Sequence, residues 1–151
     1  MAKAKMLWRR GRGALGALNP LLGTWVAIAG SAQGRVRCKQ TFSRVLGGAY
    51  VQLVTNWRYG QKTYDELALY GVGENGKLSF WSFTSDGKNS RGTVADGSDI
   101  HPEALGFQAA MPAGLARMVY WPDEDGGFVW AVEAKTKKGW KRFTEHHYKK
   151  A

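Results

Sequence analysis

The sequence predicts an all-β protein, a single antiparallel up-and-down β-barrel of about ten strands with a short helical turn before the first strand. Three observations support this prediction. Short segments alternate between apolar and polar residues, turn residues recur at intervals of about 8–12 residues, and no sustained helical period follows residue 20. The chain of 151 residues suffices for one domain with a core, and its 20 glycines, seven Trp, six Tyr and six Phe are typical of strands joined by tight turns.

The individual strands follow from this alternation. From residue 22 onward strand follows turn, and the second strand has an apolar inner face at Val36, Cys38, Gln40 and Phe42. Asn75-Gly76 is the strongest hairpin signal, because a type I′ turn requires a positive φ at both central residues. The segment 105–110 fits either a strand or a single helical turn. We expect the other strands at 49–59, 63–72, 77–84, 90–95, 115–121, 128–134 and 140–148.

The positive charge is concentrated at the N-terminus. Residues 1–18 contain five basic residues (Lys3, Lys5, Arg9, Arg10 and Arg12) and no acidic one, so they carry half of the net charge of +10. We therefore predict a basic, flexible tail at 1–18 and a β-barrel domain at 19–151. Such a tail attracts nucleic acid or an anionic membrane surface, resembles an organelle transit segment, or is simply a solvated extension.

The sequence also bears on location. No apolar run approaches the ~20 residues that a transmembrane helix needs. The single cysteine, Cys38, cannot form an internal disulfide. We expect a cytoplasmic protein, whereas the sequence does not indicate its oligomeric state.

Short motifs add a resemblance to this pattern. Leu21-Leu22-Gly23-Thr24-Trp25 resembles the start of the first strand in calycins, the superfamily of lipocalins and fatty-acid-binding proteins. There the tryptophan plugs the closed end of the barrel, which is the role the resemblance implies for Trp25. The layout is most similar to bacterial lipocalin-like domains of unknown function, through Leu46-Gly47-Gly48, Gly139-Trp140 and Tyr148-Lys149. It resembles the haem-binding nitrobindins more distantly.

The last strand suggests a binding site. Uninterrupted alternation would place Trp140, Arg142, Thr144, His146 and Tyr148 on one face, which we interpret as the face of the lumen. The predicted ligand-binding residues are Trp25, Gln40, Arg142, His146 and Tyr148. Fatty-acid-binding proteins have Arg-x-Tyr near the end of this strand, and here the corresponding residues are His146-x-Tyr148.

These residues favour non-enzymatic binding of a small, largely apolar ligand in the barrel. The simpler alternative is that Arg142, His146 and Tyr148 form an internal hydrogen-bond network. A second hypothesis is haem binding through His146 or His147, and a third is contact with nucleic acid or anionic membrane through the basic surface. We expect no catalytic site and no metal site. Whether aromatic side chains fill the lumen stays open at this point.

Overall fold

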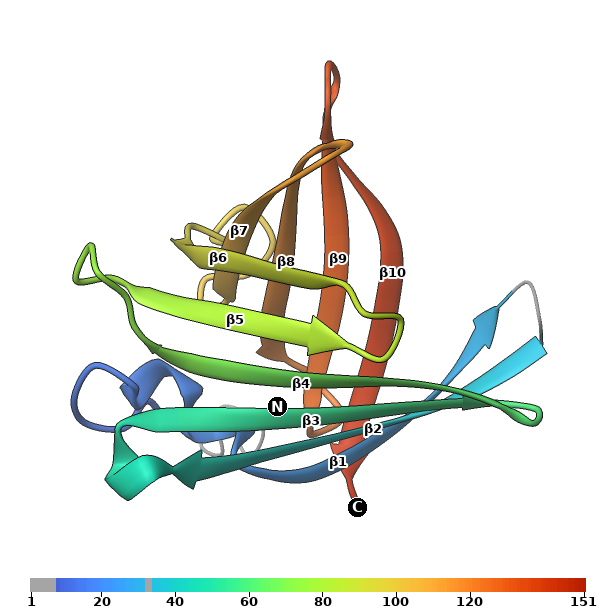
Figure 1. The fold of residues 1–151 in the computed structure, drawn as a ribbon, viewed down its shortest axis with the longest axis horizontal. Helices are drawn as coiled ribbons and strands as arrows, with labels where there is room; N and C mark the ends of the chain where they lie inside the picture. Colours follow the sequence, from blue (N-terminus) through green and yellow to red (C-terminus); the bar gives the residue numbers. More distant parts are fainter. Residues whose placement is uncertain (1–7, 32–33) are drawn as a thin grey trace.

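Each strand of the barrel pairs with the strands that precede and follow it in the chain, and the first strand closes the sheet against the last (Figure 1). The computed structural model describes residues 8–31 and 34–151. The predicted antiparallel up-and-down barrel of ten strands, with a helical turn before the first strand, is confirmed. The elements, with η for a 3-10 helix, are η1 (Gly16–Leu21), β1 (Gly23–Ser31), β2 (Gly34–Val45), η2 (Leu46–Gly48), β3 (Tyr50–Tyr59), β4 (Lys62–Val72), β5 (Leu78–Thr84), β6 (Asn89–Ala95), β7 (Leu105–Met111), β8 (Gly114–Pro122), β9 (Phe128–Thr136) and β10 (Gly139–Lys150).

Alternation along the strands determines which side chains enter the barrel. On β2 the predicted inner residues Val36, Cys38, Gln40 and Phe42 are buried. The intervening Arg35, Arg37 and Lys39 are exposed on the outer face. The segment 105–110, which fitted a strand or a helical turn, is the strand β7.

Large aromatic side chains fill one end of the barrel, and we call this set the aromatic floor: Trp25, Phe42, Tyr70, Phe107, Tyr120, Phe128 and Tyr148. Phe128 stacks on Tyr148 and meets Trp25 edge to face, with a centroid distance of 5.1 Å in each pair. The hydroxyl groups of Tyr70 and Tyr120 share a hydrogen bond of 2.9 Å. Leu18 and Leu21 of η1 are fully buried in the same core, so this end of the barrel is closed.

The closing pair of strands is joined only next to the floor. In the described part of the chain, β1 and β10 pair at Trp25–Lys150 and Val26–Lys149. Beyond these residues β1 and β2 extend away from β10 (Figure 1). A hollow of about 370 Å³ lies between the diverging strands, and Ile28, Trp57 and His146 are among the residues that line it.

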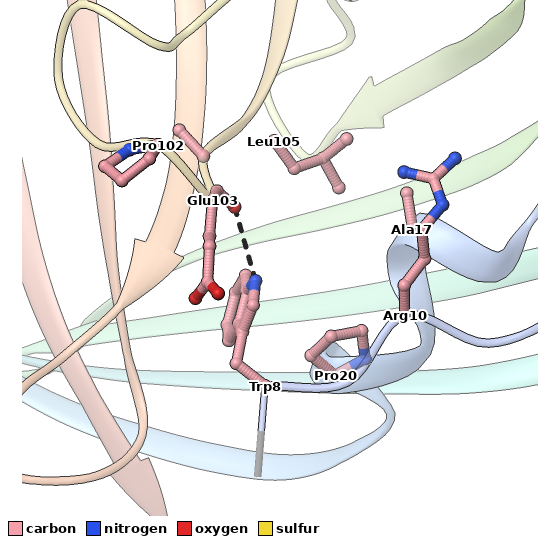
Figure 2. A pocket seen from close by; sticks show the side chains of 8 residues that line it. Trp8, Arg10, Ala17, Pro20, Pro102, Glu103 and Leu105 are labelled. Carbon is pink, nitrogen blue, oxygen red and sulfur yellow. Dashed lines mark hydrogen bonds between the residues drawn. The ribbon is translucent and has the colours of Figure 1, made fainter. Parts of the chain in front are cut away.

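The segment before η1 packs against the closed end. Leu15 and Leu18, which fall within the predicted tail, are buried core residues. The indole N–H of Trp8 donates to the carbonyl of Glu103 at 3.3 Å, and this contact borders a surface hollow of about 250 Å³ (Figure 2). The part of the predicted tail at residues 1–7 lies outside the described residues. Among those that are described, no helix is long and apolar enough to cross a membrane.

The turn between β8 and β9 provides a test of how β10 is held. Gly126 and Gly127 both have positive φ, 92° and 74°, but only at Gly127 would a Cβ collide with the backbone carbonyl of Tyr148. Replacement of Gly126 by alanine should cost about 1 kcal/mol of unfolding free energy, the cost of the backbone conformation. Gly127→Ala should cost clearly more, because the turn must also move away from β10. Urea unfolding of the two variants measures the difference, and equal losses would contradict this account of the turn.

Candidate functional site

The half of the barrel opposite the aromatic floor contains a cavity of about 500 Å³, which we call the upper cavity. The aromatic floor closes one end of the lumen, and this cavity occupies the other, so the aromatics fill only part of the barrel. Its walls come from β4 to β9, with Phe143 of β10 at one side. Most of the lining is apolar, including Phe80, Phe107, Ala109, Ala116, Met118 and Trp130. Polar groups enter at Tyr64, Glu66 and Ser90.

Glu66 is the charged group on the inner face of these walls. It lies on β4 in the same phase of alternation as Ala68 and Tyr70, both of which are buried. Ser82, on the neighbouring strand β5, donates a hydrogen bond from its hydroxyl to Glu66 Oε2. Among the described residues no cation forms an ion pair with Glu66, and Oε1 has no hydrogen-bond donor.

The negative charge of Glu66 affects the pKa of three tyrosines in the aromatic floor. Burial raises the pKa of Tyr70, Tyr120 and Tyr148, and the charge of Glu66 raises all three further because an anion disfavours a second anion nearby. These hydroxyl groups therefore stay protonated and act as hydrogen-bond partners within the core.

Trp25 lies at the floor, away from the upper cavity. Its indole N–H donates to the carbonyl of Leu21 at 2.7 Å, and Lys150 places its ammonium 4.7 Å from the ring centroid. Gly23 precedes it with φ of 121°, where a Cβ would collide with Lys150 Nζ. Because the Lys150 side chain can move aside, the positive φ is the feature of this position that favours glycine.

Gln40, His146 and Tyr148 all point inward, but none of them lines the upper cavity. His146 Nδ1 and the Tyr148 hydroxyl share a hydrogen bond of 3.3 Å. The His146 ring lies 5.1 Å from the rings of both Trp57 and Trp130, and Trp130 is the member of this group that lines the cavity. Burial, with a smaller effect of the charge on His147, lowers the pKa of His146 to about 4. The side chain is therefore neutral at physiological pH.

The polar atoms of Gln40 are not fully satisfied. Gln40 is almost completely buried and is paired with Thr55 across β2 and β3. Gln40 Oε1, Thr55 Oγ1 and Trp130 Nε1 are buried without a hydrogen-bond partner among the described residues.

The prediction that Arg142 lines the lumen is wrong. A β-bulge at Phe143 changes the register of β10, so that Arg142 lies opposite Glu133 while Thr144 lies opposite Val132. One extra residue reverses the alternation, which turns Arg142 and Trp140 outward and leaves His146 and Tyr148 inside. Arg142 donates to Glu133 at 2.9 Å and to Glu145 at 2.6 Å.

On the outer wall Arg142 belongs to an ion-pair cluster around Glu133. Arg117, with only 4% of its side chain exposed, donates to Glu133 at 2.8 Å and to both carboxylate oxygens of Asp99 at 2.9 and 2.7 Å. The ring of Trp140 lies 4.5 Å from the guanidinium of Arg117. Because Asp99 belongs to the loop between β6 and β7, the cluster holds this loop against the barrel.

The described histidines do not fit a haem bound in the upper cavity. His146 lies behind Trp130, and His147 points outward to Asp123 at 2.9 Å and Glu145 at 2.8 Å. His101 Nδ1 accepts the backbone N–H of Glu103 in the loop between β6 and β7. No described histidine lines this cavity, so an axial ligand is missing there. The described residues also contain no group of three or more potential metal ligands.

Comparison with known proteins adds no family. No family model matches the chain, and a search of curated proteins finds no match. The resemblance to calycins therefore remains an expectation from the sequence motifs, and the site must be interpreted from its own geometry.

Glu66 was not among the predicted site residues, because the sequence of β4 does not show which of its two faces points inward. Tyr64, Glu66, Ala68 and Tyr70 share one phase, so the two buried residues place Glu66 inside. Leu67 and Leu69 lie on the outer face of β4 and are as apolar as Ala68 and Tyr70 on the inner face. Hydropathy alone therefore could not show which face of β4 points inward.

The buried His146 should make stability depend on pH. Its folded pKa of about 4 lies below the unfolded value near 6.5, so unfolded chains bind the proton more strongly. Its contribution therefore lowers the unfolding free energy as pH falls from about 6.5 towards 4, by about 1–2 kcal/mol between pH 7 and pH 5. His146→Phe, which keeps a ring between the two indoles, should remove this contribution in urea titrations at several pH values.

A control at the neighbouring histidine should behave in the opposite way. Hydrogen bonds to Asp123 and Glu145 raise the pKa of His147, so its stabilisation is present at low pH and is lost as pH rises through the raised pKa. His147→Gln should therefore make the acid-side loss of stability steeper. A His146→Phe profile that parallels the wild type would contradict the burial of a neutral imidazole.

The role of the outer-wall cluster can be tested through its central carboxylate. Glu133→Gln should cost about 3 kcal/mol of unfolding free energy, because it leaves two guanidinium groups without a shared buried anion. Glu145→Gln removes a carboxylate that is 39% exposed and bonds the same Arg142, and it should cost less than about 1 kcal/mol. If both substitutions lower the free energy of unfolding in urea equally, the buried ion pairs of Glu133 do not stabilise the outer wall of the barrel.

Proposed function

We propose that the protein binds a small, largely apolar molecule in the upper cavity and that this binding, without chemical conversion of the ligand, is its function. The observation that carries the proposal is a cavity of about 500 Å³ with apolar walls above a closed aromatic floor. Small-molecule sites usually have volumes of about 300–1,000 Å³ and combine apolar walls with a few placed polar groups.

The rim of the cavity supports the proposal. Met111 and Phe143 line the cavity and are also exposed, Phe143 to 63%. Leu115 adjoins them and is exposed as well. Exposed apolar side chains that continue into a concave apolar wall are typical of a ligand portal.

The basic surface supports a weaker second candidate, contact with nucleic acid or an anionic membrane. Arg35, Arg37 and Lys39 are exposed on β2, and Arg37 lies opposite Arg58 on β3. Arg58 is itself paired with Asp65 at 3.2 Å. These exposed basic residues do not belong to a recognised nucleic-acid-binding or membrane-binding fold. The cavity has a defined volume and lining, so we favour small-molecule binding as the function. The cytoplasmic location stays a prediction from the sequence.

A cavity-filling variant tests the proposal with a neutral solvatochromic probe, Nile red. Ala109 and Ala116 lie opposite each other on β7 and β8, and both line the cavity. The double variant Ala109→Leu/Ala116→Leu should lower the affinity for Nile red by about tenfold or more, because added side-chain volume must be displaced by the probe. Fluorescence titration gives the affinity.

Ala110→Leu is the matched control. Ala110 follows Ala109 on β7 and is exposed on the outer face, so this change adds the same group outside the barrel. It should leave the affinity for Nile red unchanged, and thermal unfolding of all variants confirms that they fold. If the double variant binds Nile red as tightly as the wild type, the probe does not bind in the upper cavity.

A further inference from the structure

We propose that the upper cavity selects apolar molecules that carry one organic cation, a protonated amine in the simplest case, and that Glu66 is the counter-ion. This inference rests on the proposed function, since it names the class of ligand for the same cavity. It begins from Glu66, an anion in a mostly apolar lining whose only hydrogen bond among the described residues comes from the Ser82 hydroxyl.

The chain does not provide its own cation for this carboxylate. Arg117 and Lys135 contribute to the edge of the cavity, but both belong to the outward phase of their strands. Arg117 is engaged with Glu133 and Asp99, and Lys135 places its ammonium 5.1 Å from the ring centroid of Trp140. In the described structure, therefore, Glu66 is a carboxylate on the inner wall without an ion pair.

An anion in such a position favours a cationic ligand. A carboxylate loses hydration when an apolar molecule fills the space next to it, and this loss is costly unless an opposite charge or a donor replaces the water. A neutral apolar ligand would impose the cost without offsetting it, and a carboxylate ligand would add repulsion. An ammonium group offsets the cost and also donates to the Oε1 atom that lacks a donor.

The walls around Glu66 fit the same class of ligand. Aromatic rings of Tyr64, Phe80, Phe107 and Trp130 line the cavity, and ring faces attract cations through their quadrupole. Two of these rings, Phe80 and Phe107, are in contact at 5.7 Å between centroids. A carboxylate among several aromatic rings is therefore suited to an amine attached to an apolar body.

Three probes of equal chain length separate charge from apolar contact: decylamine, decanol and decanoate, each added at pH 7 to displace Nile red. Decylamine should bind about tenfold more tightly than decanol, and decanoate should bind most weakly. The net charge of +10 would by itself favour decanoate, so a preference for the amine cannot come from non-specific attraction.

Two carboxylate variants locate the preference. Glu66→Gln retains an acceptor for Ser82 and removes the charge, and it should abolish the preference for decylamine. Decanol should bind this variant at least as tightly as it binds the wild type, because an amide is less costly to dehydrate than a carboxylate. Asp65→Asn makes the same charge change on the adjacent outward residue of β4, where Asp65 pairs with Arg58. This control should keep the full preference for decylamine.

The outcomes distinguish this inference from the proposed function. If decanol and Nile red bind but decylamine binds the wild type no better than decanol, the inference is overturned and the apolar binding site stands. The same conclusion follows if Glu66→Gln keeps the preference. If neither Nile red nor any of the three probes binds the wild type, the proposed function fails and the inference fails with it. The ranking in the wild type tests the selectivity for a cation even if Glu66→Gln does not fold.

Discussion

The contact of Phe128 with Trp25 on one side and Tyr148 on the other is the interaction on which the barrel depends. It joins β1, β9 and β10 where the sheet must close, and the ladder between β1 and β10 is only two residue pairs long in the described chain. A ladder this short cannot hold a barrel closed unless side-chain packing supports it. The hydrogen bond of Trp25 to Leu21 fixes the indole, so η1 and the floor close the same end together.

The upper cavity follows from the way side-chain size changes along the strands. From the floor towards the open end, the inward residues of β7 change from Phe107 to Ala109, and those of β8 from Tyr120 through Met118 to Ala116. The strands β7, β8 and β9 stay paired along this wall, so smaller side chains leave space that larger ones would fill. The decrease in side-chain size from the floor along β7 and β8 thus makes room for the cavity.

The sequence predicted the strands because alternation and turn chemistry are local properties, and the inner face of β2 shows this residue by residue. It could not predict the bulge at Phe143, since an aromatic residue within an alternating segment fits either face. The outward position of Arg142 is stabilised by Glu133, and this partner comes from another strand. Leu15 and Leu18 were likewise assigned to a tail, because their burial depends on the floor they pack against.

If an amine binds in the upper cavity as proposed, the charge distribution affects its approach and its bound state differently. With a net charge of +10, the protein as a whole repels a cation during approach, so electrostatic steering cannot accelerate the association of an amine. Glu66 acts only at short range, inside a wall that excludes part of the solvent, where an ion pair is less screened. An amine should therefore owe its affinity to slow dissociation. Added salt should screen the long-range repulsion more than the internal pair, so that weak salt dependence would accompany strong dependence on Glu66.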